Sequence, residues 1–401
     1  MNVLELFAGA GGAAIGLKRA GMDHLLCVEW NEAACRTLEA AGLPALQHDL
    51  REPLPVAIEQ HVDAMWSSTP CQPFSTAGKR LGAQDERNGF PWMWARVDEH
   101  RPRWLMVENV PGMLMHSGGA DNCPGGRPDE CSACYFHEVV LAEARRRFAW
   151  VGYRVLNSSA YGVPQHRRRV YLVCGPRRIR WPAPTHCDPD HGILLAAGLR
   201  PWVSVGEALG LSGEFNTSFG EAGYRKPKNT QSDQPTGSVT TKGIMLLEPM
   251  GHPEWAKSVD GPADAVGTKG NAYLSRSRTG RMRMNYPLSS PPENPRGPSD
   301  LVKRHEVETP ELPASTVRTG APVYLLEKQQ RRRLTCEEQA RLMAFPDGWP
   351  FQGNKTQKYS QSGNACCPPV VEAIGRAVME ADDMARTATT KPGEGPCAQE
   401  E

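Results

Sequence analysis

Short apolar runs alternate with segments of helical periodicity through the first 182 residues of the chain. An apolar run at residues 2–6 leads into the glycine-rich stretch LFAGAGG, and residues 13–21 then have helical spacing that ends at Gly21. Because strands that alternate with helices favour a parallel sheet covered on both faces, we expect an α/β fold. Further strands are expected at 24–30, 45–50, 62–69, 103–110 and 168–175, and further helices at 31–42 (with Asn31 as N-cap) and 137–153.

The pattern changes near residue 183, where Gly, Pro, Ser, Thr and Asn become frequent. The next long amphipathic helix is expected at residues 335–345. Three similar stretches lie between, QPTGSVTTKG, GPADAVGTKG and LPASTVRTG, which are either strand–turn units of a small irregular domain or a chance result of the composition. We expect residues 385–401 to form a disordered tail, because they are polar and lack apolar periodicity.

The composition excludes several classes of protein. A length of 401 residues allows two domains, and a net charge of +1 leaves nucleic-acid binding to local basic patches such as residues 225–304, where 13 Lys or Arg face 7 Asp or Glu. The sequence lacks an apolar run of membrane-spanning length and the pattern of a secretion signal. We therefore expect a soluble, cytoplasmic protein whose twelve cysteines serve catalysis or metal binding more readily than disulfides.

The glycine-rich turn follows a strand and opens a helix, so its backbone can approach a ligand closely. Glu29 ends the second expected strand, where a ribose diol would lie, and Asp49 ends the third, where it could accept from an adenine amino group. Phe7 and Trp30 could enclose an adenine ring. The turn lacks a Gly-Lys-Ser/Thr triplet, so a nucleoside without phosphates fits it better, although GGAAIG does not exclude a dinucleotide.

A single cysteine stands between two prolines in STPCQPFS, just after the fourth expected strand. Cys71 therefore lies at the sheet edge where open α/β folds bind ligands, and a thiol there is a candidate nucleophile. Glu108 ends the next strand, in ENV, and could face the same pocket. In PQHRRRV, the alternate residues Gln165, Arg167 and Arg169 would share one face of an extended segment.

Together these stretches resemble the ordered motifs of the DNA (cytosine-5) methyltransferase family, of the prokaryotic or phage type. The motifs are LELFAGAGG, STPCQPFS, ENV and QHRRR, followed by RRRLTCEEQARLMAFPDGW and SGNACCPPVVEAIG near the C-terminus. Six motifs in the family order make the match specific. The resemblance implies a Rossmann-like sheet of an S-adenosylmethionine-dependent methyltransferase with an inserted, smaller and irregular target-recognition domain. The implied boundaries are 1–182 (catalytic and cofactor-binding), 183–325 (target recognition) and 326–384 (a C-terminal return that completes the catalytic domain).

The resemblance also implies a reaction, the transfer of a methyl group from S-adenosylmethionine to C5 of a cytosine flipped out of double-stranded DNA at a specific sequence. Cys71 matches the family nucleophile that adds to cytosine C6, and Glu108 matches the acid at N3. Arg167 and Arg169 match a pair that contacts cytosine O2 and braces the catalytic loop, implied at residues 75–90. The implied cofactor contacts are Phe7, Ala8, Gly9, Gly11, Gly12, Glu29, Trp30, Asp49, Leu50, Pro70 and Asn364.

The resemblance assigns target recognition to the insertion, whose arginines suit phosphate and guanine contacts. A solvated basic loop explains any one of these arginines equally well. We expect a monomer that is associated with the nucleoid and is genetically paired with a cognate restriction endonuclease. The expected DNA contacts are Gln72, Ser75, Gln165, Arg276, Arg278, Arg281 and Arg283.

One stretch departs from the family pattern, the cysteine-rich insert at residues 116–137. Its Cys123, Cys131, Cys134 and His137, with glycine and proline turns between them, resemble a zinc clip with three sulfur ligands and one nitrogen ligand. His137 could equally be only the first residue of a helix, with His116 as the alternative ligand. The insert is therefore a candidate structural zinc site.

Three other functions remain open at this point. A relative that modifies RNA would typically carry a Cys-Phe-Thr tripeptide and lack a long recognition insert, and the chain differs in both respects. A DNA-binding protein that has lost catalysis is disfavoured by the intact Cys71, Glu108 and arginine pair. Transfer of a different one-carbon group from a modified sulfonium donor is compatible with the same residues.

Overall fold

The computed structural model describes residues 1–74, 84–116, 131–210 and 334–389, with side chains up to residue 384, and the backbone of short strands between residues 216 and 333. Among these residues, we find no helix with the length and apolar character that a membrane crossing requires.

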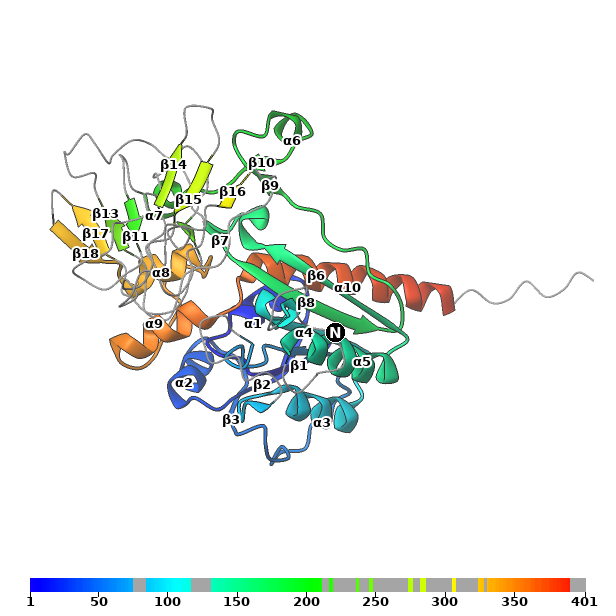
Figure 1. The fold of residues 1–401 in the computed structure, drawn as a ribbon. Coiled ribbons are helices and arrows are strands. Elements are labelled where there is room, and N and C mark those ends of the chain that lie inside the picture. The colour runs from blue at the N-terminus through cyan, green and yellow to red at the C-terminus, as the bar shows by residue number, and fades with distance from the viewer. Residues whose placement is uncertain are drawn as a thin grey trace, which may run out of the picture.

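A seven-stranded sheet forms the centre of the fold (Figure 1). Its strands, in spatial order, are β3 (Ala45–Gln47), β2 (Asp23–Glu29), β1 (Asn2–Leu6), β4 (Ala64–Ser67), β5 (Trp104–Asn109), β8 (Arg168–Gly175) and β6 (Trp150–Asn157). The first five are parallel, whereas β8 runs antiparallel to both β5 and β6. The α/β prediction is confirmed, and the expectation of a fully parallel sheet is wrong at β8. The connection from β6 to β8 is too short for the crossover that a parallel pair needs.

Strand β6 replaces the end of a predicted helix. The helical segment consists of α4 (Ser132–Cys134), a π-helical turn η4 (Tyr135–Val140) and α5 (Leu141–Arg147), and Phe148 is already extended. Residues 150–153, expected in that helix, begin β6 instead. Tryptophan, valine and tyrosine favour a strand, and Gly152 disfavours a helix, so local preference explains the difference.

Alternate residues of the strands face two separate cores. Val3 of β1 belongs to the core beneath α1 (Gly12–Arg19) and α10 (Pro368–Thr389), whereas Leu4 belongs to the core beneath α3 (Phe90–His100) and α5. Figure 1 shows α1 and α10 near each other in the fold. The two-residue period of a strand therefore covers the sheet with helices on both faces, as expected. The helix α2 (Glu32–Ala40) begins as predicted, because Asn31 Oδ1 accepts from Ala34 N at 3.1 Å.

The C-terminal segment packs against the first part of the chain through α8 (Cys336–Leu342), α9 (Lys355–Asn364) and α10. Trp349 Nε1 donates to Ala10 O at 3.0 Å, and Trp104 Nε1 donates to Asp382 Oδ1 at 3.0 Å. Helix α10 runs to Thr389, so the first residues of the expected tail are helical. Residues 390–401 lie outside the described residues.

The insertion begins with two short strands and two short helices, β9 (His186–Cys187), α6 (Gly192–Ala196), β10 (Arg200–Pro201) and α7 (Val205–Leu209). Beyond residue 210 the described backbone forms antiparallel pairs. One sheet has the order β11 (Asn216–Ser218), β13 (Met245–Leu247), β18 (Gln330–Arg333) and β17 (Tyr324–Glu327), and another has the order β14 (Tyr273–Arg276), β15 (Met282–Asn285) and β16 (His305–Val307). A further pair joins β12 (Thr236–Gly237) to β7 (Gln165–His166), so the insertion returns to the strand that precedes the arginines.

Candidate active site

The glycine-rich turn is held by the carboxylate at the end of β2. Glu29 Oε2 accepts from Gly9 N at 2.8 Å, and Oε1 accepts from Asn31 N at 2.9 Å. Burial raises the pKa of Glu29, and the backbone N–H groups oppose that rise. Phe7 has a φ of 55°, a left-handed conformation that is costly for a residue with a side chain and that clusters at functional sites. The turn is thus shaped by the acid that was predicted to meet a ribose.

The glycines of this turn have different roles. A side chain at Gly9 would meet no atom within 4 Å, whereas a Cβ at Gly12 would lie 2.3 Å from Cys366 O. Gly11 has a φ of 86°, and a Cβ there would crowd Leu38 and Trp349. Gly9 therefore borders open space that a ligand can use. Gly12, predicted as a cofactor contact, is needed for the close approach of the C-terminal segment.

The residues expected around an adenine are only partly assembled. Trp30 is 73% exposed, and the half-buried Phe7 has its ring centroid 6.4 Å from that of Trp92. Asp49 forms a hydrogen-bonded pair with Arg51, which lowers the pKa of the Asp49 carboxyl. The other expected contacts lie nearby in the fold with unequal exposure: Ala8 and Leu50 are buried, Pro70 is half-buried and Asn364 is exposed at the end of α9.

The loop that carries Cys71 follows β4 and is tied down by side chains from other segments. Asn109 Nδ2 donates to Thr69 Oγ1 at 2.9 Å and to Thr69 O at 3.2 Å. Ser68 Oγ lies 3.3 Å from Cys366 Sγ, and Phe74 N donates to Cys71 O at 3.1 Å. The half-buried thiol therefore lies on a turn that is fixed on both sides.

Two of the predicted catalytic residues meet directly. Arg169 Nε lies 2.9 Å from Glu108 Oε1, and both side chains are buried. Arg167 Nη2 donates to Ala365 O at 3.1 Å. Burial raises the pKa of Cys71, Arg169 and then Arg167 oppose that rise, and Glu108 adds to it. The two arginines therefore favour the Cys71 thiolate over what burial alone would allow, whereas the Glu108 carboxylate disfavours it.

The residues predicted to contact DNA differ in exposure, and the structure describes only some of them. Gln72 is exposed beside Cys71. Gln165 is fully buried instead, and its Nε2 donates to Leu342 O at 2.9 Å. The amide of Gln165 thus joins β7 to the end of α8, and its contact with DNA stays a prediction. Ser75, Arg278 and Arg281 lie outside the described residues, and Arg276 and Arg283 are described only as backbone of β14 and β15.

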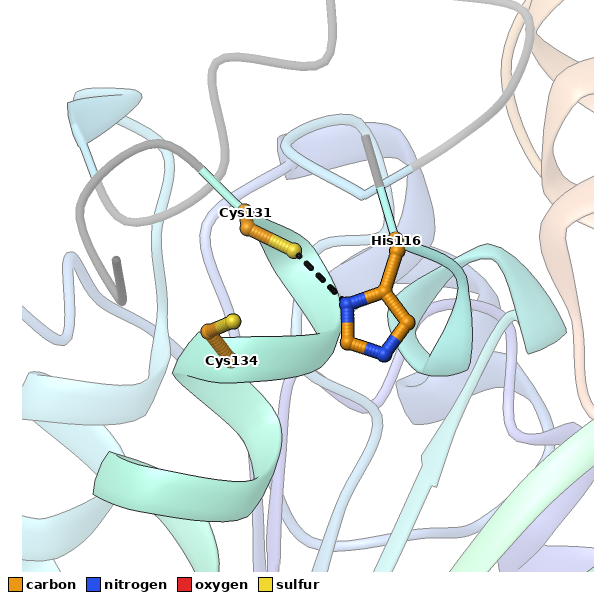
Figure 2. Close-up of side chains that lie close together, drawn as sticks. All are labelled: His116, Cys131 and Cys134. Atoms are coloured by element: carbon orange, nitrogen blue, oxygen red, sulfur yellow. Dashed lines mark hydrogen bonds between the residues drawn. The ribbon is translucent and has the colours of Figure 1, made fainter. Parts of the chain in front are cut away.

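The metal ligands predicted in the insert are rearranged. Figure 2 shows His116, Cys131 and Cys134 close together, with His116 Nδ1 3.4 Å from Cys131 Sγ. His137 is exposed and lies instead against the rings of Phe136 and Tyr153, outside this group of ligands. The choice of His137 over His116 is thus corrected, because the helical turn after Cys134 points His137 elsewhere. Cys123 lies outside the described residues.

Two residues that support the site were missed from the sequence. A Cβ at Gly89 would lie 2.7 Å from Pro70 Cδ and 2.9 Å from Phe7 Cζ, so glycine lets the glycine-rich turn (the cofactor turn, residues 6–12) and the Cys71 loop pack together without displacement of either side chain. Asn109 was quoted as part of ENV but given no role, although it holds Thr69. Gly89 carries the pattern of a helix start, which indicates α3 but not the two loops that it touches.

Comparison with known proteins agrees with this geometry. A family model described as C-5 cytosine-specific DNA methylase matches residues 1–185 and 212–380. The Type II methyltransferase M.NaeI of Lentzea aerocolonigenes is 29% identical over 398 residues, covering 96% of this chain and 76% of that protein. M.NgoMIV of Neisseria gonorrhoeae is 28% identical over 384 residues, covering 94% and 97%. The solved Entamoeba histolytica methyltransferase EhMeth, 13% identical with a TM-score of 0.53 over 96% of this chain and 98% of its own, shares the fold. The chain therefore belongs to the C-5 cytosine-specific DNA methylases and is a DNA (cytosine-5) methyltransferase.

Proposed function

We propose that this enzyme methylates cytosines at a specific sequence in double-stranded DNA, by flipping the target base and adding Cys71 to its C6 atom. The observation that carries the proposal is the buried Glu108–Arg169 pair, whose atoms lie 2.9 Å apart and whose charges act on the Cys71 thiol. A nucleophile, an acid and a cation gathered at one sheet edge suit covalent catalysis. A cytosine reaches them only after leaving the stack.

Family membership implies S-adenosylmethionine as the methyl donor, and the residues of the turn fit a nucleoside. Gly9 borders open space, Glu29 offers a carboxylate for a ribose diol, and Trp30 exposes an aromatic surface. Glu29, Phe7 and Trp30 would hold the nucleoside, with Asp49 as an acceptor for its amino group. When bound, the donor supplies an electrophilic methyl group on a positively charged sulfur.

The chain's own residues account for activation of the cytosine. The Cys71 thiol gives up its proton to solvent, and the thiolate Sγ forms a bond to C6. Glu108, in its protonated form, donates a proton to N3, so the electron pair of the C5–C6 double bond becomes available at C5. C5 uses that pair to bond the methyl group. A base from solvent then removes the C5 proton, and the electron pair of the C5–H bond re-forms the C5–C6 double bond. Sγ leaves C6 as the thiolate, and N3 returns its proton to Glu108. Arg167 and Arg169 hold positive charge beside the thiolate during addition.

The surroundings of the site support the finer part of the proposal. We assign sequence readout to the insertion at residues 183–325 and a contact beside the flipped base to the exposed Gln72. Several relatives are named Type II methyltransferases, so we propose that this enzyme protects DNA within a restriction–modification pair. We expect it to act as a monomer on the nucleoid.

Methylation sequencing of DNA from cells that express the protein tests activity and target together. We expect 5-methylcytosine at one recurrent sequence, absent from cells with the empty vector and from cells that express Cys71→Ala. Methylation scattered without a common sequence would contradict sequence-specific recognition. Methylated transfer RNA with unmodified DNA would assign the enzyme to the RNA-modifying branch.

A further inference from the structure

We propose that His116, Cys131 and Cys134 bind a structural zinc ion. The ligand atoms of the three residues lie within 4.8 Å of one another, and His116 Nδ1 lies 3.4 Å from Cys131 Sγ (Figure 2). Zinc bonds of about 2.3 Å to sulfur and about 2.0 Å to nitrogen place neighbouring tetrahedral ligands roughly 3.5 Å apart. His116 and Cys131 are therefore at the spacing of zinc ligands and Cys134 lies within 4.8 Å of both, so the described part of the chain supplies three of the four ligands.

The ligand chemistry selects the metal. Two thiols and an imidazole are soft or borderline donors that bind zinc, whereas magnesium and calcium require oxygen ligands. Cys131 and Cys134 are buried, and His116 is half-buried. A hydrogen bond between His116 and Cys131 explains one contact, but a metal ion also explains why Cys134 joins them.

The described residues at the C-terminal end of the insert divide into two parts: Tyr135 and Phe136 belong to the core that also contains Met113, and Cys131, Ala133 and Cys134 do not. Cys131, Ala133 and Cys134 form a buried cluster of their own, apart from the two cores that cover the sheet. Three small side chains bury little apolar surface, so they stabilise the insert weakly. A metal clip that closes the chain between residues 116 and 131 restricts the unfolded state and links binding to folding.

His116 of the zinc site is connected to Glu108 by a short segment of the chain. Strand β5 ends with Glu108 and Asn109, and the short 3₁₀ helix η2 (Pro111–Leu114) connects it to His116. Met113 of η2 is buried in the same core as the strands. His116 therefore stands a short, packed segment away from the acid of the active site.

Cys134 of the zinc site is connected to the Cys71 loop through the next residue, Tyr135. Tyr135 follows Cys134 directly, and its ring stacks on Phe74 with centroids 5.8 Å apart and planes inclined by 11°. Its hydroxyl accepts from Asn88 Nδ2 at 2.8 Å. Tyr135 also begins the π-helical turn η4, a distortion that often marks functional positions. The zinc ion would thus fix Tyr135, which supports the base of the loop that carries the nucleophile.

A second group of ligand types shows why the proposal is confined to the insert. Glu5, His24 and Cys27 satisfy the same 4.8 Å limit inside the sheet. There His24 Nε2 pairs with Glu5 Oε2 at 2.8 Å, and strand pairing between β1 and β2 already fixes all three residues. A metal is not needed to explain that group, whereas His116, Cys131 and Cys134 lie outside any strand and are not fixed by strand pairing.

Zinc content of the purified full-length protein tests the proposal. We expect about one zinc ion per chain, with most of it lost in Cys131→Ser, in Cys134→Ser and in His116→Ala. The matched controls are Cys336→Ser, which changes a cysteine outside the group, and His137→Ala, which changes the nearby histidine; both should retain zinc. Cobalt added to metal-free protein should give the absorption of a tetrahedral thiolate site in the wild type and lose it in Cys131→Ser.

Three outcomes would overturn the zinc site. The first is protein purified with reduced thiols that contains no zinc, and the second is zinc that persists in Cys131→Ser and Cys134→Ser. The third is a zinc-free protein whose mass shows Cys131 joined to Cys134 as a disulfide. If the variants are insoluble, a chelator added to the wild type decides: zinc release with a lower Tm supports the site, and an unchanged Tm without release refutes it. None of these measurements depends on methylation activity.

Discussion

The cofactor turn and the Cys71 loop lie at the same sheet edge but are held in different ways. The turn is fixed mainly by β2, because Glu29 accepts from Gly9 N across 20 residues and Ala8 N donates to Val28 O, with one distant hydrogen bond from Trp349 Nε1 to Ala10 O across 339 residues. The Cys71 loop is fixed by side chains from later segments: Ser68 meets Cys366 from 298 residues away, and Asn109 Nδ2 donates to Thr69 Oγ1 from 40 residues away. Cofactor binding should therefore be separable from catalysis by local changes. The geometry of Cys71 should depend on the whole catalytic part of the fold.

Removal of the nucleophile should give the largest effect and separate the two regions most clearly. Cys71→Ala is expected to lower methyl transfer by at least about 10³-fold, because no other group forms the bond to C6. Binding of S-adenosylmethionine should remain within about threefold of the wild type, since the cofactor turn does not use the thiol. Radiolabelled methyl transfer and calorimetric titration measure the two quantities.

The control for this variant is Cys336→Ser, which changes a cysteine outside the active site and should retain activity. Substantial turnover by Cys71→Ala would refute covalent catalysis through this residue. A joint loss of transfer and of cofactor binding would instead show that the two regions are not separable.

Loss of the Glu29 carboxylate from the turn should weaken binding of S-adenosylmethionine, which Cys71→Ala leaves nearly unchanged. Glu29→Ala removes the acceptor of Gly9 N and Asn31 N and the proposed partner of the ribose. Hydrogen bonds to a charged group contribute about 1.5–3 kcal/mol, so we expect the Kd for S-adenosylmethionine to rise by about 10–100-fold. Glu32→Ala, an exposed acid three residues further along, serves as the control. An unchanged Kd in Glu29→Ala would remove this residue from the cofactor site.

The same contrast explains which features the sequence predicts. Cys71, Glu108 and Glu29 could be placed because each ends or follows a recognisable strand, and strand ends meet at one edge in this fold. The burial of Gln165 could not be predicted, because alternation gives a shared face but not what covers it, and α8 comes from 177 residues away. His116 was ranked below His137 because spacing along the chain does not show how the insert's ends meet. In the last two cases the deciding contacts lie between segments whose meeting the local pattern does not show.

Acidic pH should lower the free energy of unfolding through His166, the residue that precedes Arg167. Burial lowers the pKa of His166 to about 4, and its ring lies against Trp202 at 4.6 Å with Nδ1 2.9 Å from Ser159 Oγ. The folded state holds the His166 ring neutral, so the contribution of this ring to the free energy of unfolding is complete above pH 6.5. It is lost as pH falls from about 6.5 toward 4, because the unfolded chain takes up the proton first.

Urea unfolding at pH 7.5 and pH 5 measures this effect. We expect the wild type to lose about 2 kcal/mol more than His166→Gln over that interval, since the pKa difference is then largely realised. His48→Gln, which changes a half-buried histidine just before Asp49, should behave as the wild type does. An equal loss in wild type and His166→Gln would place the acid sensitivity in other groups.

The smallest expected effect comes from Gly89, a described residue that lies between Phe7 of the turn and Pro70 of the Cys71 loop. Alanine there needs Phe7 and Pro70 to move, because its Cβ would lie under 3 Å from each. Its backbone φ of −78° accepts alanine, so the strain falls on these two neighbours. We expect a cost of about 1 kcal/mol shared between them, seen as about a threefold rise in the Kd for S-adenosylmethionine and a similar fall in kcat. Gly192→Ala, which meets no atom within 4 Å, should change neither quantity. If Gly89→Ala alters the Kd and leaves kcat unchanged, Gly89 does not connect the turn to the Cys71 loop. A contact shared by both regions must change both quantities.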